Sequence, residues 1–148
     1  MAKAKRKATY ATELAGIRGA RLIGERVATD LEYVRRVEEG LPAAAIDRLM
    51  RAAGLTEDDM DRVIPRRTRN RQRSRGRLSR EQSDRLARAA DVYALAFDVF
   101  GDPEKAKRWM REPNPALVGD APLELLRTAT GAELVESVLL RIAHGVYT

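Results

Sequence analysis

The sequence predicts an all-α protein. Apolar residues recur every three or four positions along most of the chain, which is the period of a helix. Residues that favour helix ends stand on both sides of these segments. No segment alternates apolar and polar residues with the period of two that a half-buried strand requires. A chain of 148 residues forms one domain, or two small domains that share an interface.

Composition narrows the class of protein. The chain has no Cys and one His, so disulfides, thiol nucleophiles and the usual zinc ligand sets are excluded. No segment approaches the roughly 20 apolar residues of a membrane span. The basic start, residues 1–7, is not followed by the apolar stretch of a secretory signal. We therefore expect a cytoplasmic protein with no membrane partner, no metal and no cofactor.

Charge divides the chain into two unlike halves. Residues 1–80 hold 20 Lys and Arg against 11 Asp and Glu, whereas residues 81–148 hold 8 against 11. A basic half joined to a mildly acidic half favours two surfaces with two kinds of partner. The alternative is that the charge is unevenly distributed by chance, together with a basic tail, and indicates no second partner.

The N-terminal region is predicted to become helical only gradually. Residues 1–11 are basic and lack a sustained apolar period, so we expect a disordered arm. Residues 12–29 predict a weak helix, because three glycines interrupt it. Asp30 is predicted to cap a firmer helix that ends at Gly40. The apolar positions of that helix are Leu31, Val34 and Val37.

Three short helices with tight joints are predicted next, over Leu41–Gly54, Leu55–Ile64 and Arg66–Arg75. Thr56, with Asp59 three residues later, resembles a capping box for the second of them. Residues 65–80 hold eight Arg and no acid, with a single large apolar residue, so the third helix is not a core helix. This arrangement predicts a helix–turn–helix whose third helix enters the major groove of DNA.

The side chains of the third helix predict two kinds of DNA contact. Arg pairs bidentately with guanine and Asn with adenine, whereas other polar groups hold phosphates. The alternative is a disordered linker that binds any polyanion, and Arg density alone does not separate DNA from RNA. The predicted base readers are Arg67, Arg69, Asn70 and Arg73, and the predicted phosphate contacts are Arg66, Thr68 and Arg71.

The longest helix is predicted over about Arg80–Phe100, capped by Ser79. Its apolar residues cover more than one stripe, so we expect it to lie at the centre of the fold. Three shorter helices are predicted after it. Asp102-Pro103-Glu104 marks the start of the first, and Asp120 and Pro122 mark the start of the second. The last begins with a Thr130 cap and Glu133, runs through Ile142 and ends at Gly145.

The last eight residues differ from an ordinary polar chain end. Tyr147 stands one residue from the end, and Arg141 precedes it on the same extension. An aromatic residue and an Arg on a short extension can anchor in a partner's pocket. The alternative, that the tail folds back on its own domain, remains open. Glu133 and Glu136 share a helix face, but no nucleophile or His partner accompanies them, so we expect no catalytic residues and no enzyme.

Several motifs in fixed order resemble a known family. From Leu78 on, over about 70 residues, the chain resembles the toxin-binding domain of Xre/MbcA/ParS-type antitoxins, and Leu41–Arg77 resembles the Xre helix–turn–helix. After the basic arm and weak helix expected over residues 1–29, the resemblance implies a DNA-binding domain over 30–77 and a toxin-binding and dimerisation domain over 78–148. The motifs are Phe97–Gly101, Ala106–Met110, Pro113–Leu117, Gly119–Leu126, Thr130–Glu133 and Leu140–Tyr147.

The resemblance also implies a function. Antitoxins of this type pair with a RES-domain toxin that destroys NAD, and their C-terminal segment enters the toxin's active-site cleft. They form homodimers and repress their own operon by binding operator DNA. The alternative is a stand-alone repressor whose second half only dimerises. Trp109 and Asn114 match as structural residues, and the implied toxin contacts are Arg141, His144, Gly145, Val146, Tyr147 and Thr148.

Overall fold

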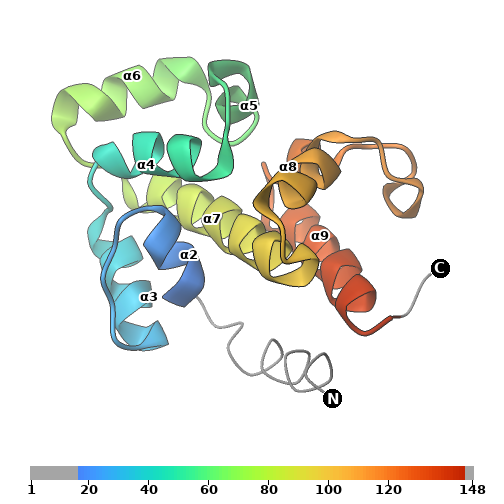
Figure 1. Cartoon of the computed structure of the whole chain (residues 1–148). Coiled ribbons are helices and arrows are strands. Elements are labelled where there is room, and N and C mark those ends of the chain that lie inside the picture. The colour runs from blue at the N-terminus through green and yellow to red at the C-terminus, as the bar shows by residue number, and fades with distance from the viewer. Residues whose placement is uncertain (1–16, 146–148) are drawn as a thin grey trace.

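The computed structural model describes residues 17–145. These residues form helices and no strand, with one isolated bridge between Pro42 and Arg77 (Figure 1), so the predicted all-α fold is confirmed. The elements in order are α2 (Ile17–Leu22), α3 (Asp30–Glu39), α4 (Ala44–Ala53), α5 (Glu57–Asp61), α6 (Arg66–Arg75), α7 (Arg80–Phe100), α8 (Pro103–Arg111), the 3₁₀ turns η1 (Pro115–Leu117) and η2 (Pro122–Leu125), and α9 (Ala129–Ala143).

Helix α7 lies at the centre of the molecule, as its apolar surface predicts. It packs against α2, α3, α4, α8 and α9, and in Figure 1 α4 lies above it whereas α2 and α3 lie below it. Ser79 caps it, since its side chain accepts a hydrogen bond from the backbone N–H of Gln82 at 3.2 Å. Alanines such as Ala89, Ala90 and Ala96 are completely buried and allow the neighbouring helices to approach closely.

Most of the predicted helix boundaries are confirmed, but two caps are wrong. Thr29, not Asp30, caps α3, because its backbone is extended and its side chain accepts from the N–H of Glu32. Thr128, not Thr130, caps α9 and accepts from the N–H of Gly131 at 3.0 Å. The earlier start puts Gly131 in the first turn, where a Cβ would lie 2.1 Å from the carbonyl oxygen of Leu125. Packing on η2 therefore sets this helix start.

Of the three apolar positions expected along α3, only Val37 packs against the core. Leu31 and Val34 are 60% and 50% exposed, whereas Tyr33 is only 4% exposed. Helix α3 contacts α7 and α2, and Tyr33 is its buried residue. An apolar edge consequently remains open beside α7.

Two arginines connect the helix–turn–helix to the C-terminal half. Arg111 at the end of α8 donates to the carbonyl oxygen of Gly54 at 2.6 Å and pairs with Asp59 at 2.5 Å. Arg62, just after α5, pairs with Glu124 in η2 at 3.1 Å. Between residues 17 and 145, no helix combines the length and apolarity needed to cross a membrane.

Asp91 is an acid placed in the middle of α7. Its Oδ1 atom is buried without a hydrogen-bond partner among the described residues, and a Cβ on Gly19 of α2 would lie 1.9 Å from it. Burial, followed by the nearby carboxylates of Glu136, Asp30 and Asp84, raises the pKa of Asp91 to about 8.

This raised pKa predicts that folding stability falls as the pH increases. Between the ordinary value of 3.8 and about 8, the folded chain keeps the Asp91 proton and the unfolded chain does not. The free energy of unfolding therefore decreases with pH across this window. Asp91→Asn should remove part of the decrease and should be more stable than wild type above about pH 8.

Urea unfolding at about pH 5 and about pH 8 measures the effect in chains whose Lys3, Lys5 and Lys7 are changed to Gln, so that no lysine ammonium from residues 1–11 holds Asp91 ionised. Glu112→Gln, which changes an exposed acid after α8, is the matched control and should keep the wild-type decrease. A decrease in Asp91→Asn equal to that of wild type would contradict the prediction.

Candidate functional site

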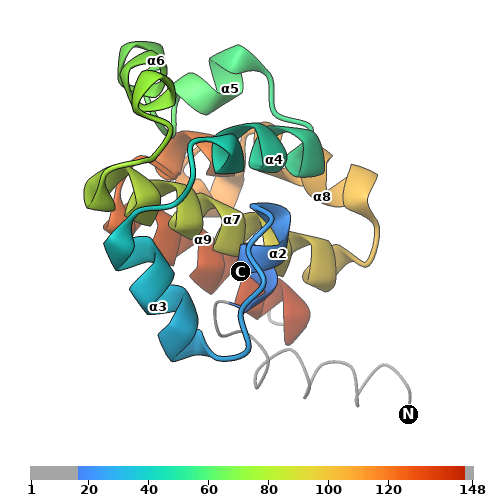
Figure 2. The same cartoon turned by 90° about the vertical axis from the view of Figure 1, so that its left-hand side faces the viewer.

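Helices α4, α5 and α6 form a three-helix unit at one edge of the molecule, and the segments at its two ends are joined by hydrogen bonds. In Figures 1 and 2, α4 lies between α6 and α7, and α6 is outermost. Backbone hydrogen bonds fasten the end of α6 to the segment before α4. The N–H of Ala43 donates to the carbonyl oxygen of Gly76 at 3.0 Å, and the N–H of Leu78 donates to the carbonyl oxygen of Leu41 at 2.8 Å. These bonds fix the position of α6 relative to the rest of the unit.

Arg69 is the residue that holds α6 against α5. Its side chain is 0% exposed, and its Nη1 atom donates to Asp61 Oδ1 at 2.8 Å and to the carbonyl oxygen of Ile64 at 2.7 Å. Its Nη2 atom pairs with Glu57 Oε2 at 2.6 Å. The prediction that Arg69 reads a base is therefore wrong, because the guanidinium is enclosed and already paired with two carboxylates.

The inner side of α6 is polar throughout. Its buried residues are Arg69 and Gln72, and Gln72 Oε1 accepts a hydrogen bond from the N–H of Ser79. The sequence carried a signal for this arrangement that was missed. Glu57 and Asp61 stand four residues apart on α5 and share a face, which predicts an inward-pointing cation on the next helix.

The outer side of α6 carries the remaining predicted residues. Arg67, Asn70 and Arg71 are exposed, and their spacing puts them on one helix face opposite the buried residues. Ser74 completes that face and was missed by sequence reasoning, although it follows Asn70 by four residues. Arg66 and Arg75 are exposed beside this face, and Thr68 is half-buried.

Arg73 lies at the edge of the exposed face. Its side chain is 33% exposed and pairs with Asp47 of α4 at 2.8 Å. Helix α6 contains no acid. The face around Arg67, Asn70 and Arg71 thus offers guanidinium and amide donors without a nearby competing carboxylate on the same helix, which is the chemistry that binds phosphates and base edges.

The end of α9 is the second candidate site. Arg141 is half-buried and His144 is exposed, and the N–H of His144 donates to Leu140 at 3.0 Å. Gly145 has a φ of 73°, a left-handed conformation that ends the helix as predicted. Val146, Tyr147 and Thr148 lie outside the described residues. In Figure 1, the end of α9 and helix α6 lie on opposite sides of α7.

Two residues expected to be structural, Trp109 and Asn114, lie in α8 and just before η1. The ring of Trp109 contacts that of Phe100, with centroids 5.6 Å apart. Asn114 caps η1 by accepting a hydrogen bond from the N–H of Ala116 at 2.9 Å. In the part of the chain that the structure describes, no group of three or more His, Cys, Asp or Glu could hold a metal ion.

Two family models match the chain, and together they cover most of it. Residues 32–91 match the antitoxin Xre-like helix-turn-helix domain, which includes α3 to α6 and the first half of α7. Residues 95–145 match the antitoxin Xre/MbcA/ParS C-terminal toxin-binding domain, which includes α8 and α9. The predicted domain boundary at residues 77–78 stays a prediction.

Curated relatives agree with these matches. The chain is 38% identical to an antitoxin Xre of Pseudomonas putida over 80% of this chain and 76% of the relative. It is 34% identical to an antitoxin Xre of Yersinia enterocolitica over 86% and 89% of the two chains. It is also 26% identical to a Prs ADP-ribosylating antitoxin of a Sphingobium species over 81% of this chain and 83% of the relative. With a helix–turn–helix followed by a toxin-binding domain, the chain belongs to the Xre family of antitoxins.

Proposed function

We propose that the protein neutralises a RES-domain toxin that degrades NAD, by inserting its C-terminal segment into the toxin's active site. The observation that carries the proposal is the family's toxin-binding domain over residues 95–145, which ends where α9 leads into residues 146–148. The contacts proposed for the toxin are Arg141, His144, Gly145, Val146, Tyr147 and Thr148. A Tyr ring on a short extension supplies a large contact area at a low entropic cost.

The toxin's reaction has a second candidate. The Sphingobium relative is named a Prs ADP-ribosylating antitoxin, which favours transfer of ADP-ribose to a protein over destruction of free NAD. Both reactions use NAD as a substrate, so a tail that fills the NAD cleft would block either. The amount of NAD in cells that express the toxin alone distinguishes them.

We also propose that the protein binds operator DNA through α6 and represses its own operon as a homodimer. The exposure of the side chains supports base reading by Arg67, Asn70 and Arg71, with Arg66, Thr68, Arg73 and Arg75 on phosphates. Compared with the sequence prediction, this set omits Arg69, moves Arg71 from phosphate to base, moves Arg73 from base to phosphate, and adds Arg75. Leu134 of α9 is 44% exposed and supports dimerisation through the C-terminal half.

The proposal for the tail predicts that a short truncation abolishes neutralisation. A chain that lacks Val146, Tyr147 and Thr148 should no longer rescue growth when it is expressed with the toxin encoded beside its gene. It should still shift operator DNA, because α6 lies across α7 from the end of α9. Tyr147→Ala should lose most of the rescue on its own.

Growth and cellular NAD after induction of both proteins are the measurements. Full rescue by the truncated chain would show that the tail does not act in the toxin's cleft. If no neighbouring gene product is toxic, the stand-alone repressor becomes the better reading.

The proposal for α6 predicts two classes of Arg substitution. Arg67→Ala, Asn70→Ala and Arg71→Ala should each weaken operator binding by about 1–3 kcal/mol and relax specificity at one position. Arg66→Ala and Arg75→Ala should weaken binding to all sequences and reduce the salt dependence by about 0.9 in the log–log slope. Gel shifts at several salt concentrations separate the classes. Arg108→Ala removes an exposed charge from α8 and is the matched control.

Substitution of Arg69 should reduce stability rather than only DNA binding, because Arg69 holds α6 against α5 and does not face outward. Arg69→Ala leaves two carboxylates and a carbonyl without their donor, and it should lower the free energy of unfolding by about 2 kcal/mol or more. Thermal unfolding measures this loss, and Arg67→Ala is the control that should keep the wild-type Tm. Equal Tm values for the two variants would contradict the role given to Arg69.

A further inference from the structure

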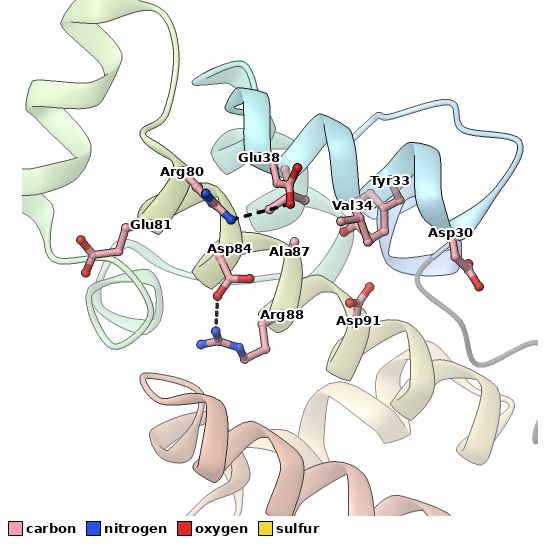
Figure 3. A pocket seen from close by; sticks show the side chains of 11 residues that line it. Asp30, Tyr33, Val34, Glu38, Arg80, Glu81, Asp84, Ala87, Arg88 and Asp91 are labelled. Carbon is pink, nitrogen blue, oxygen red and sulfur yellow. Dashed lines mark hydrogen bonds and ion pairs between the residues drawn. The ribbon is translucent and has the colours of Figure 1, made fainter.

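A groove of about 880 Å³ lies between α3 and the first half of α7, away from both proposed sites. Figure 3 shows Tyr33 and Val34 of α3 facing Ala87 and Asp91 of α7 across it. Val34 is the exposed apolar residue at its rim. Neither operator binding through α6 nor toxin binding through the tail uses this groove.

The groove has more negative than positive charge, and its positive charge is already engaged. Five of its lining residues are acids and two are Arg. Arg80 pairs with Glu38 at 3.6 Å and Arg88 pairs with Asp84, as the dashed lines in Figure 3 mark. A further lining acid, Glu81, pairs with Arg85. Two acids, Asp30 and Asp91, thus have no ion pair among the described residues.

Two buried polar groups of the groove lack a hydrogen-bond partner among residues 17–145. The Tyr33 side chain is almost completely buried, yet its hydroxyl is unpartnered. Asp91 Oδ1 on the facing helix is also unpartnered. Buried polar groups in folded proteins are paired in the great majority of cases. Two orphans in one groove therefore indicate a ligand with hydrogen-bond donors.

A lysine side chain fits these groups best. Its ammonium carries three donors and no acceptor, so it satisfies both a carboxylate and a phenol oxygen. Its apolar stem can lie along Val34 and Ala87 while the charged end reaches Asp91. A positive charge also favours the ionised form of Asp91, whose pKa is raised by burial and by nearby acids.

The chain itself carries such lysines in the segment that precedes α2. Lys3, Lys5 and Lys7 precede its first acid, Glu13. Helix α2 begins at Ile17, and its Gly19 packs directly against Asp91. Residues 1–16 therefore join the described body beside the groove. Ten extended residues span about 33 Å, and a short tether gives an effective concentration on the order of millimolar.

We propose that the groove between α3 and α7 binds a lysine side chain from residues 1–11 of the same chain, with the ammonium donating to Asp91 and to the Tyr33 hydroxyl. The acids of the groove then hold the basic N-terminal segment on the side of α7 away from α6. The positive charge of this segment is thereby withheld from DNA, and α6 supplies the DNA-binding charge. The proposal does not depend on the identity of the toxin.

A spin label tests this proposal in the full-length chain. Because the protein has no Cys, Ala4→Cys carries a nitroxide at a single position. The label should broaden the backbone amide signals of Val34, Ala87 and Asp91 in an NMR spectrum and leave that of Ala116 on η1, at the far side of the molecule from α3, unchanged. Asp91→Asn and Tyr33→Phe should each restore most of the lost intensity. Glu112→Gln, an exposed acid outside the groove, should keep the broadening.

Three results would overturn the proposal. They are no broadening at the groove, broadening that persists in both Asp91→Asn and Tyr33→Phe, and broadening that persists when Lys3, Lys5 and Lys7 are all changed to Gln. The last variant leaves the groove intact, so it decides the matter if a groove variant fails to fold. Broadening in a mixture of ¹⁵N chains without label and spin-labelled ¹⁴N chains would assign the lysine to a second copy and overturn the same-chain proposal.

Discussion

The burial of α7 on several sides is the constraint on which the rest of the structure depends. A helix of 21 residues is about 31 Å long, and it packs against α2, α3, α4, α8 and α9. The helix–turn–helix and the toxin-binding domain of the family therefore share one core element and are not two units on a linker. As a result, α6 and the end of α9 are held on opposite sides of one rigid element (Figure 1).

The acids of α5 explain how a strongly basic unit holds together. Asp59 completes the capping box with Thr56 and also pairs with Arg111, so one carboxylate joins α5 to α8. Glu57 and Asp61 both pair with Arg69 and join α5 to α6. Asp47 of α4 pairs with Arg73. These four carboxylates thus lie where helices meet and pair with arginines there. The arginines that they do not pair with remain at the surface.

Local signals allowed the sequence to predict the helices, whereas contacts between helices limited the details. Ser79, Thr56 and Asp102 cap their helices as expected, because the hydrogen bond of a cap joins residues that are close in sequence. Thr128 and Thr130 are both good caps, and the packing of Gly131 on Leu125 decides between them. The arginines of α6 look alike in sequence, and only the position of α5 determines that Arg69 points inward. Exposure of Leu31 likewise depends on how α3 lies on α7.

The polar inner side of α6 has a consequence for temperature. Apolar contacts weaken on cooling, because the hydrophobic effect loses strength at low temperature. The buried side chains of α6 are Arg69 and Gln72, so ion pairs and hydrogen bonds attach this helix to its neighbours. Its attachment should therefore change little in the cold, while the alanine-lined contacts of α7 become weaker.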